Sequence, residues 1–202
     1  MNKNTVQRIF QRKGWQVRKR AVGFRPRIQV VPSVAQLPDE RRATDLCRIW
    51  AGQGGWCQLA LVMDCCTREL LGWHLSRCGK SKTAESALEQ ALINRFGYLG
   101  RVTGPFLLCS DNGLVFTSQS YTAQVKGYGL QQEFITPCTP EQNGMVERLI
   151  RTLKAQCVHR HRFESLAHAS RVIADWVGYD NHRRPHQALG MQTPAVRYQL
   201  AA

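Results

Sequence analysis

The order of apolar runs along the chain limits its possible fold more than any other feature. Three runs of β-type composition follow one another closely, at residues 43–50, 55–64 and 68–76, with turn residues between them. Helical and β-type segments then alternate up to about residue 157. This β-β-β-α-β-α-β-α order predicts a mixed α/β sheet whose first three strands form an antiparallel meander.

The alternating part of the pattern contains four clear elements before the last helix. Residues 81–97 carry apolar side chains at helical spacing and end at a glycine (Ala84, Ala87, Leu88, Ala91, Leu92, Gly97). Residues 104–113 predict a short apolar strand that ends at a turn, residues 117–129 a helix, and residues 130–136 another strand. We expect the fourth strand of the sheet to lie beside the first.

Two aspartates mark the ends of these neighbouring strands. In open α/β sheets, functional groups collect where adjacent strands end, which places Asp45 of the first strand near Asp111, just past the fourth. A purely structural role remains open for Asp111, because aspartate before Asn-Gly is also common turn chemistry.

A third carboxylate comes from the helix that follows Thr139. Thr139 and Gln142 form a plausible capping box, and regular helix is expected from about Met145. One stripe of this helix is apolar (Val146, Leu149, Ile150, Leu153, Cys157). At 100° per residue, Glu147 lies with Arg151 and Lys154 on a neighbouring stripe. These cations predict a track for phosphate groups, although Glu147 and Arg151 at i,i+4 are also compatible with a simple surface pair.

The charge distribution indicates a polyanionic partner. The chain has a formal net charge of +14, and residues 1–30 contain nine Lys or Arg and no acid. Such an arm neutralises phosphates, so nucleic acid is the expected partner, with a solvated arm or an anionic membrane surface as alternatives. No apolar run reaches the roughly 18 residues of a membrane span, and the first residues do not resemble a signal peptide, so we expect a cytoplasmic protein.

The eight cysteines do not predict a metal ribbon or a disulfide framework. The sequence contains no C-x-x-C pair, and the default for cysteines without a secretory signal is a buried thiol. Cys157 with His161, and His182 with His186, have i,i+4 spacing that leaves a zinc site as a minor alternative.

Three segments together resemble the catalytic motifs of DDE transposases and retroviral integrases: TD at 44–45, SDNG at 110–113 and PEQNG-x-x-ER at 140–148. Asp111 and Glu147 are separated by 35 residues, the spacing of the integrase branch. The chain is most similar to OrfB-type transposases of bacterial insertion sequences, from about residue 40 to 198. Arg42 and Asp180 depart from that pattern, where an aromatic residue and a tyrosine are usual, and put the local packing in question.

This resemblance implies a ribonuclease H-like fold, with a mixed five-stranded sheet flanked by helices, a basic N-terminal arm and a helical C-terminal extension. The corresponding domains are residues 1–38, 39–160 and 161–202. It implies catalytic and metal-binding roles for Asp45, Asp111 and Glu147. Converging carboxylates need cations to stay ionised, and hard oxygen ligands suit two Mg²⁺ or Mn²⁺ ions that promote in-line phosphoryl transfer.

The resemblance also implies partners and further site residues. The expected partners are the terminal repeats of an insertion sequence and target DNA, bound by a homo-oligomer at the bacterial nucleoid, with no membrane. The predicted DNA-binding residues are Asn112, Asn143, Arg151, Lys154, Arg183, Arg184 and His186. For Arg183, Arg184 and His186, packing between domains is an equal alternative. Asp64 is expected to have a structural role with Arg68 as its partner.

Two other functions are compatible with these residues. A ribonuclease H-type hydrolase would share the fold and the metals but stop after attack by water. An inactive DNA-binding relic would keep the basic surface and lose the metal site.

Overall fold

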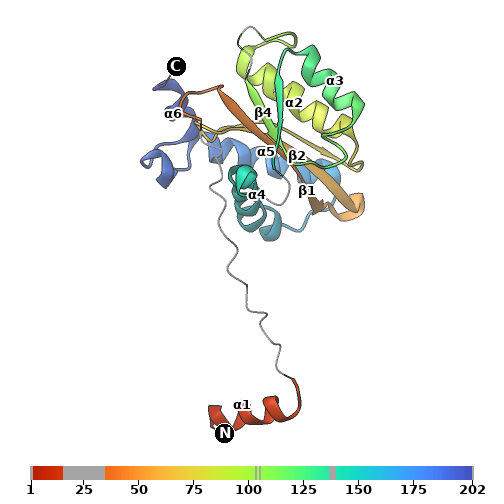
Figure 1. The fold of residues 1–202 in the computed structure, drawn as a ribbon, viewed down its shortest axis with the longest axis vertical. Coiled ribbons are helices and arrows are strands. Elements are labelled where there is room, and N and C mark those ends of the chain that lie inside the picture. Colours follow the sequence, from red (N-terminus) through yellow and green to blue (C-terminus); the bar gives the residue numbers. More distant parts are fainter. Residues whose placement is uncertain (1, 16–34, 103, 105, 137–139, 202) are drawn as a thin grey trace.

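The fold is built on a five-stranded mixed sheet with the strand order β3-β2-β1-β4-β5. Figure 1 shows the sheet, with β1, β2 and β4 labelled, among the helices that pack on it. The structure is a computed structural model that describes residues 2–15, 35–102, 104, 106–136 and 140–201, without the side chains of residues 140 and 141. The strands are β1 (Arg41–Trp50), β2 (Trp56–Asp64), β3 (Leu70–Ser76), β4 (Leu107–Ser110) and β5 (Gln131–Phe134).

The sheet topology confirms the order predicted from the apolar runs. β1, β2 and β3 form an antiparallel meander, with Asp45 opposite Leu61 in the β1–β2 register. β4 then returns parallel to β1, with Ala43 opposite Cys109, and β5 extends the sheet parallel to β4. The parallel return brings the end of β4 beside the middle of β1.

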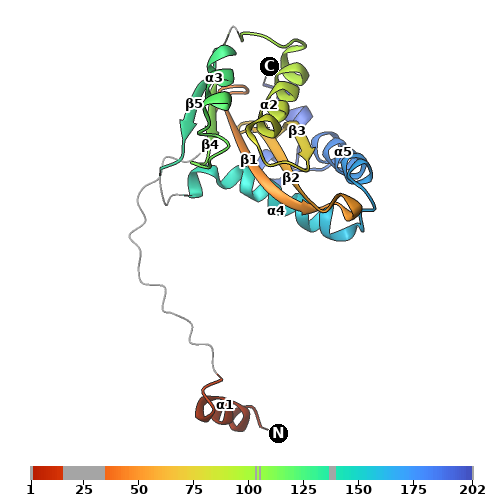
Figure 2. The same ribbon diagram turned by 90° about the vertical axis from the view of Figure 1, so that its right-hand side faces the viewer.

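Two helical layers cover the two faces of the sheet (Figure 2). One face packs against α2 (Ser81–Phe96) and α3 (Gln119–Gly127), and the other against α4 (Gly144–Gln156) and α5 (Leu166–His182). The contact with α2 is close: a Cβ added at Gly72 of β3 would lie 2.1 Å from the carbonyl oxygen of Ala87. Glycine on the strand and alanine on the helix allow this approach.

Shorter elements complete the described part of the chain: α1 (Lys3–Arg12) in the basic arm, the 3₁₀ turns η1 (Gly52–Gly54), η2 (Pro140–Asn143), η3 (Val158–Arg160) and η4 (Gln187–Leu189), and α6 (Pro194–Gln199). The predicted stop of α2 is confirmed, since Gly97 has a φ of +77° at the C-cap. In the described residues no helix is long and apolar enough to cross a bilayer.

The start of α4 differs in detail from the prediction. Thr139 of the proposed capping box lies outside the described residues. Its partner Gln142 accepts a hydrogen bond from the backbone N–H of Thr136 at 2.6 Å, so its side-chain oxygen is engaged with another segment. A 3₁₀ turn therefore leads into the helix, and α4 begins at Gly144 with the predicted apolar stripe buried.

Candidate active site

Asp45 is a half-buried acid in the middle of β1. Ala43 and Cys47, its neighbours at alternate positions, belong to the core under α4, which places Asp45 on the α4 side of the sheet. Its Oδ1 accepts a 2.6 Å hydrogen bond from the N–H of Leu46. The pKa of Asp45 is raised to about 6, mainly by burial and also by the negative charges of Asp111 and Glu147, while the Leu46 hydrogen bond and the charge of Lys154 act in the opposite direction.

Asp111 reaches the same rim because of the parallel register. Ala43 is opposite Cys109, so two residues further along both segments Asp45 comes beside Asp111. The Oδ1 of Asp111 accepts a hydrogen bond from the N–H of Gly113 at 2.9 Å, and a Cβ at Gly113 would lie 2.8 Å from that oxygen. Asp111 thus has both of the roles considered for it: it stabilises the turn after β4, and its carboxylate lies on the same rim as Asp45.

Glu147 lies in the first turn of α4, and Asn143 fixes that turn against β1. Asn143 is only 2% exposed, and its Nδ2 donates to the carbonyl oxygen of Thr44 at 3.3 Å, one residue before Asp45. Because Asn143 is buried, the structure does not support its predicted role as a DNA contact, and we assign it to positioning. Asn112 remains exposed, with its Nδ2 donating to the carbonyl oxygen of Ile135 at 2.8 Å.

The charges of Asp111 and Glu147 act on Asp45, but the three carboxylates do not form a closed metal-binding cluster in this structure. In the described ranges, no three His, Cys, Asp or Glu side chains converge closely enough to hold a metal ion. The chemistry of the donor set nevertheless fits a divalent ion, because carboxylate oxygens are the ligands preferred by Mg²⁺ and Mn²⁺. A cation at this rim would relieve the repulsion that raises the pKa of Asp45.

The two cations of α4 differ in their surroundings. Lys154 is half-buried, and its charge acts on both Asp45 and Cys47, so its ammonium group lies on the carboxylate side of the helix. Arg151 is exposed one turn earlier. Lys154 therefore provides a positive charge beside Asp45, in addition to its predicted place in the phosphate track that follows Glu147 along α4.

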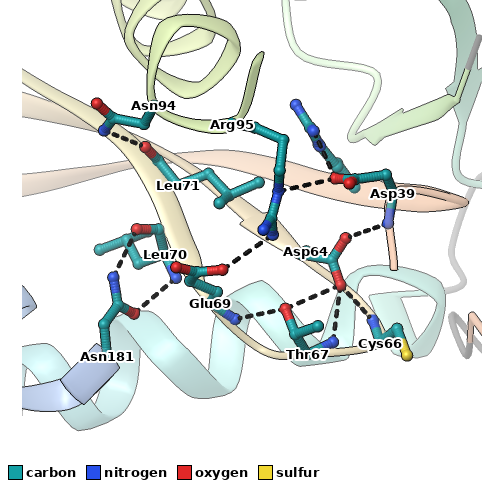
Figure 3. Close-up of polar contacts among 11 residues, drawn as sticks. Asp39, Asp64, Cys66, Thr67, Glu69, Leu70, Leu71, Asn94, Arg95 and Asn181 are labelled. Atoms are coloured by element: carbon teal, nitrogen blue, oxygen red, sulfur yellow. Dashed lines mark hydrogen bonds and ion pairs between the residues drawn. The ribbon is translucent and has the colours of Figure 1, made fainter. Parts of the chain in front are cut away.

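Asp64 is a structural residue, but its predicted partner was wrong (Figure 3). Its Oδ2 accepts from the N–H of Asp39 at 2.8 Å. Its Oδ1 accepts from the N–H groups of Cys66 and Thr67 and from the Thr67 hydroxyl. No ion pair joins the carboxylate to Arg68 among the residues described, because the tight turn after β2 presents backbone N–H groups instead.

The basic C-terminal segment is held by a buried acid. Asp180 has no exposed surface, and it pairs with Arg184 at 2.8 Å and with Nε2 of His186 at 3.5 Å. These contacts favour the packing alternative for Arg184 and His186 over DNA contact. Arg183, at the end of α5, is exposed and stays a candidate for DNA contact.

The other departure from the family pattern is also accommodated. Arg42 is fully buried in β1, where its guanidinium lies 4.0 Å from the centre of the Phe106 ring and 2.6 Å from a carboxylate oxygen of Asp39. The buried charge of Arg42 is therefore compensated by an aromatic ring and a carboxylate, which explains how this position accommodates arginine.

The zinc alternative finds no support in the described residues. Cys157 is buried, and the Nδ1 of His161 lies 2.8 Å from the carbonyl oxygen of Cys157. The cysteines that the structure describes are free thiols. Six of them are buried, as predicted (Cys47, Cys57, Cys65, Cys66, Cys109, Cys157), whereas Cys78 is exposed.

Sequence reasoning missed one group of surface residues near this site. Trp50 and Trp56 are paired across the β1–β2 hairpin and are 53% and 57% exposed. Each was interpreted only as part of a strand. The signal that could have identified them is their position on either side of the glycine-rich turn, which makes them neighbours at the end of a hairpin.

A mixed sheet of order β3-β2-β1-β4-β5 with acids from β1, the end of β4 and α4 is the ribonuclease H-like core of the integrase class. Models of the integrase core domain match residues 35–140 and 128–194. The first of these covers just over half of the 202 residues. The chain belongs to the integrase core domain family.

Curated relatives come from bacterial insertion elements. An uncharacterised protein of insertion element IS476 from Xanthomonas euvesicatoria is 29% identical over 96% of the chain and 55% of its own length. The transposase for insertion sequence element IS629 from Shigella sonnei is 29% identical over 80% of the chain and 52% of its own length. The chain thus spans about half the length of these relatives.

Solved structures share the fold at low sequence identity. A chain of the simian T-cell lymphotropic virus intasome has a TM-score of 0.67 at 16% identity and covers 86% of this chain and 60% of its own. The catalytic core domain of BIV integrase has a TM-score of 0.57 at 19% identity and covers 80% of this chain and 95% of its own. The HTLV-2 integrase core, solved in complex with magnesium, has a TM-score of 0.55 at 16% identity and covers 82% and 98%.

Proposed function

We propose that the chain is the catalytic part of an insertion-sequence transposase, which cleaves DNA at the ends of the element and joins those ends to target DNA. The observation that carries the proposal is that the charges of Asp111 and Glu147 act on Asp45, so that acids from β1, the end of β4 and α4 share one rim of the sheet. The curated relatives that are transposases of insertion elements support the choice of substrate.

In this proposal the three carboxylates are the catalytic residues and metal ligands. Two Mg²⁺ or Mn²⁺ ions bound there would activate the attacking oxygen and stabilise the leaving oxygen of an in-line displacement. Asn143 holds the start of α4 to β1 through Thr44, which fixes the separation of Glu147 and Asp45. The N–H of Gly113 holds the Asp111 carboxylate, and the hydrogen bond from Asn112 to Ile135 fixes the turn that contains both residues.

The positive side chains of the same face would position the substrate. Arg151 and Lys154 would contact successive phosphates next to the scissile bond, with Arg183 further along the C-terminal segment. The arm of residues 1–38 would add sequence-independent affinity, residues 39–160 would perform the chemistry, and residues 161–202 would complete the fold. A homo-oligomer assembled on DNA at the bacterial nucleoid fits a reaction that joins two ends of one element.

The test is cleavage and joining of a labelled terminal-repeat duplex. Asp45→Asn, Asp111→Asn and Glu147→Gln should each reduce strand cleavage below detection in Mg²⁺ or Mn²⁺, with DNA affinity largely retained. Asp175→Asn, an exposed acid on α5, is the matched control and should cleave normally. Full cleavage by any of the three triad variants would contradict the assignment of that residue.

Pre-cut ends separate the alternatives. A transposase joins them to a second duplex, whereas a ribonuclease H-type hydrolase cleaves intact strands but joins nothing. An inactive relic binds the same DNA without either reaction.

A further inference from the structure

A groove of about 1110 Å³ lies beside the candidate active site, at the end of the β1–β2 hairpin. One wall is the hairpin end, with Ile49, Trp50 and Trp56, and the other is the segment that leads from α4 to α5, residues 158–164. Lys154 of α4 and Ile49 of β1 line the groove, and the same two elements carry Glu147 and Asp45, so the groove adjoins the candidate active site.

The two walls are fixed to each other by backbone contacts. The N–H of Gln53 donates to the carbonyl oxygen of Glu164 at 3.0 Å. Gly52 has a φ of +60°, and a Cβ there would lie 2.2 Å from the carbonyl oxygen of Phe163. Because only glycine permits this approach, the hairpin turn and the 158–164 segment form one preorganised surface.

The groove contains two large aromatic side chains that are unusually exposed to solvent. The rings of Trp50 and Trp56 lie 5.6 Å apart in an edge-to-face arrangement, and both are more than half exposed. The guanidinium of Arg48 lies 5.1 Å from the centre of the Trp56 ring. Flat aromatic faces beside a guanidinium are what proteins use to stack unpaired bases.

The charge of the groove selects the ligand. Its lining carries three permanent cations, Arg48, Lys154 and Arg162, against the single acid Glu164. A second copy of this chain would bring a net charge of +14 to a basic surface, which opposes self-association there. A ligand with negative charge and exposed flat rings is required, and single-stranded DNA has both.

We propose that this groove binds unpaired nucleotides of the substrate DNA next to the scissile phosphate, by stacking bases on Trp50 and Trp56. The inference rests on the proposed function and adds a binding site to it. Ile49 in the groove wall lies four positions after Asp45 on β1, a distance of about 13 Å at the rise of a strand. At about 3.4 Å per nucleotide of one strand, the stacked bases lie within about four nucleotides of the reacting bond.

The experiment measures binding without metal, so that the DNA stays intact. The full chain and the Trp50→Leu/Trp56→Leu variant are titrated with three probes of equal length: a single-stranded oligonucleotide, its duplex, and a single strand with abasic sites. The variant should bind the single strand about tenfold more weakly and the duplex within about twofold of the parent, since stacking applies only to unpaired bases. The abasic strand should bind the parent and the variant equally.

Tyr98→Leu is the matched control, an exposed aromatic residue outside the groove lining, and it should leave all three affinities unchanged. A fluorescent adenine analogue placed at successive positions near the terminal-repeat end should be quenched by the parent within about four nucleotides of the cleavage site, and not by the Trp variant.

Three results would overturn the groove assignment: equal loss for single strand and duplex, undiminished binding of the abasic strand by the parent, or no change in the folded Trp variant. A change in sedimentation of the Trp variant without a change in single-strand preference would identify the indoles as a protein interface and also reject the proposal. If only the groove proposal is wrong, the triad variants will still be inactive. If the proposed function is wrong, those variants will cleave DNA normally.

Discussion

Two aspartates at the same sheet show how the environment of a carboxylate decides its role. Asp64 accepts hydrogen bonds from three backbone N–H groups and one hydroxyl, and it is fully buried. Asp45 accepts one backbone hydrogen bond, from the N–H of Leu46, and is under the influence of two other acids. A satisfied carboxylate stabilises the fold, while one with free lone pairs among other acids is suited to bind a cation.

The first residue-scale prediction concerns Asp64→Asn. Both carboxylate oxygens of Asp64 accept from backbone N–H groups, but the NH₂ group of asparagine cannot accept. At least one buried N–H would lose its partner, so we expect the free energy of unfolding to fall by about 1–3 kcal/mol. Urea denaturation measures this loss. Asp175→Asn, on the exposed face of α5, should change the same quantity by less than about 0.5 kcal/mol.

The same variant also tests the division of roles. At a temperature where Asp64→Asn is fully folded, its cleavage rate should equal that of the parent chain. Loss of cleavage in a folded Asp64→Asn protein, together with normal cleavage by Asp45→Asn, would move the active site to the other aspartate.

At the scale of elements, α4 joins the core to the reacting groups. Its apolar stripe packs under the sheet, its first turn carries Glu147, and its next two turns carry Arg151 and Lys154. Because Arg151 and Lys154 lie outside the apolar stripe, both can be replaced without disturbing the core or the backbone that carries Glu147.

We expect the Arg151→Gln/Lys154→Gln variant to keep its stability within about 1 kcal/mol, because both groups lie outside the buried stripe. Binding of a terminal-repeat duplex should weaken, and the slope of log affinity against log salt should fall by about 2, the contribution of two phosphate contacts. Cleavage rate measured against DNA concentration should reach the parent value at saturation.

Lys80→Gln/Lys126→Gln is the control for charge alone, since both lysines are exposed on the α2 and α3 side of the sheet. A parental binding curve for the α4 variant would refute the phosphate track. A cleavage defect that saturating DNA does not rescue would instead place these cations in the chemical step, as the closeness of Lys154 to Asp45 allows.

Periodicity and motif spacing predicted the elements and their order, because strand and helix patterns are local properties of the sequence. The meander, the pairing of β4 with β1 and the buried stripe of α4 all follow from them. Partner choices did not follow. Asp64 is bound by turn N–H groups, and Asp180 by Arg184 and His186, because those contacts depend on backbone geometry that residue types do not specify.

For the whole molecule, the distribution of charge separates affinity from chemistry. The chain carries 28 Lys and Arg against 14 Asp and Glu, and nine of those cations fall in residues 1–30. The candidate active site, in contrast, combines three acids with a few cations. A polyanion would therefore be attracted by the chain as a whole and oriented by the residues around Asp45.

The whole-molecule prediction is the effect of deleting residues 1–30 on binding to DNA. If all nine arm cations contact phosphates, the slope of log affinity against log salt should flatten by at most about 8, since each neutralised phosphate contributes about 0.9. The matched variant keeps the arm but has its nine cations replaced by Gln. It should show the same slope as the deletion, because an arm without charges adds no salt dependence. Cleavage of a short duplex at saturating concentration should be retained in both, since none of the three carboxylates lies in the arm. An unchanged slope would mean that the arm does not contact DNA in the complex. Equal slopes with a larger loss of affinity in the deletion would show that α1 also binds through uncharged contacts.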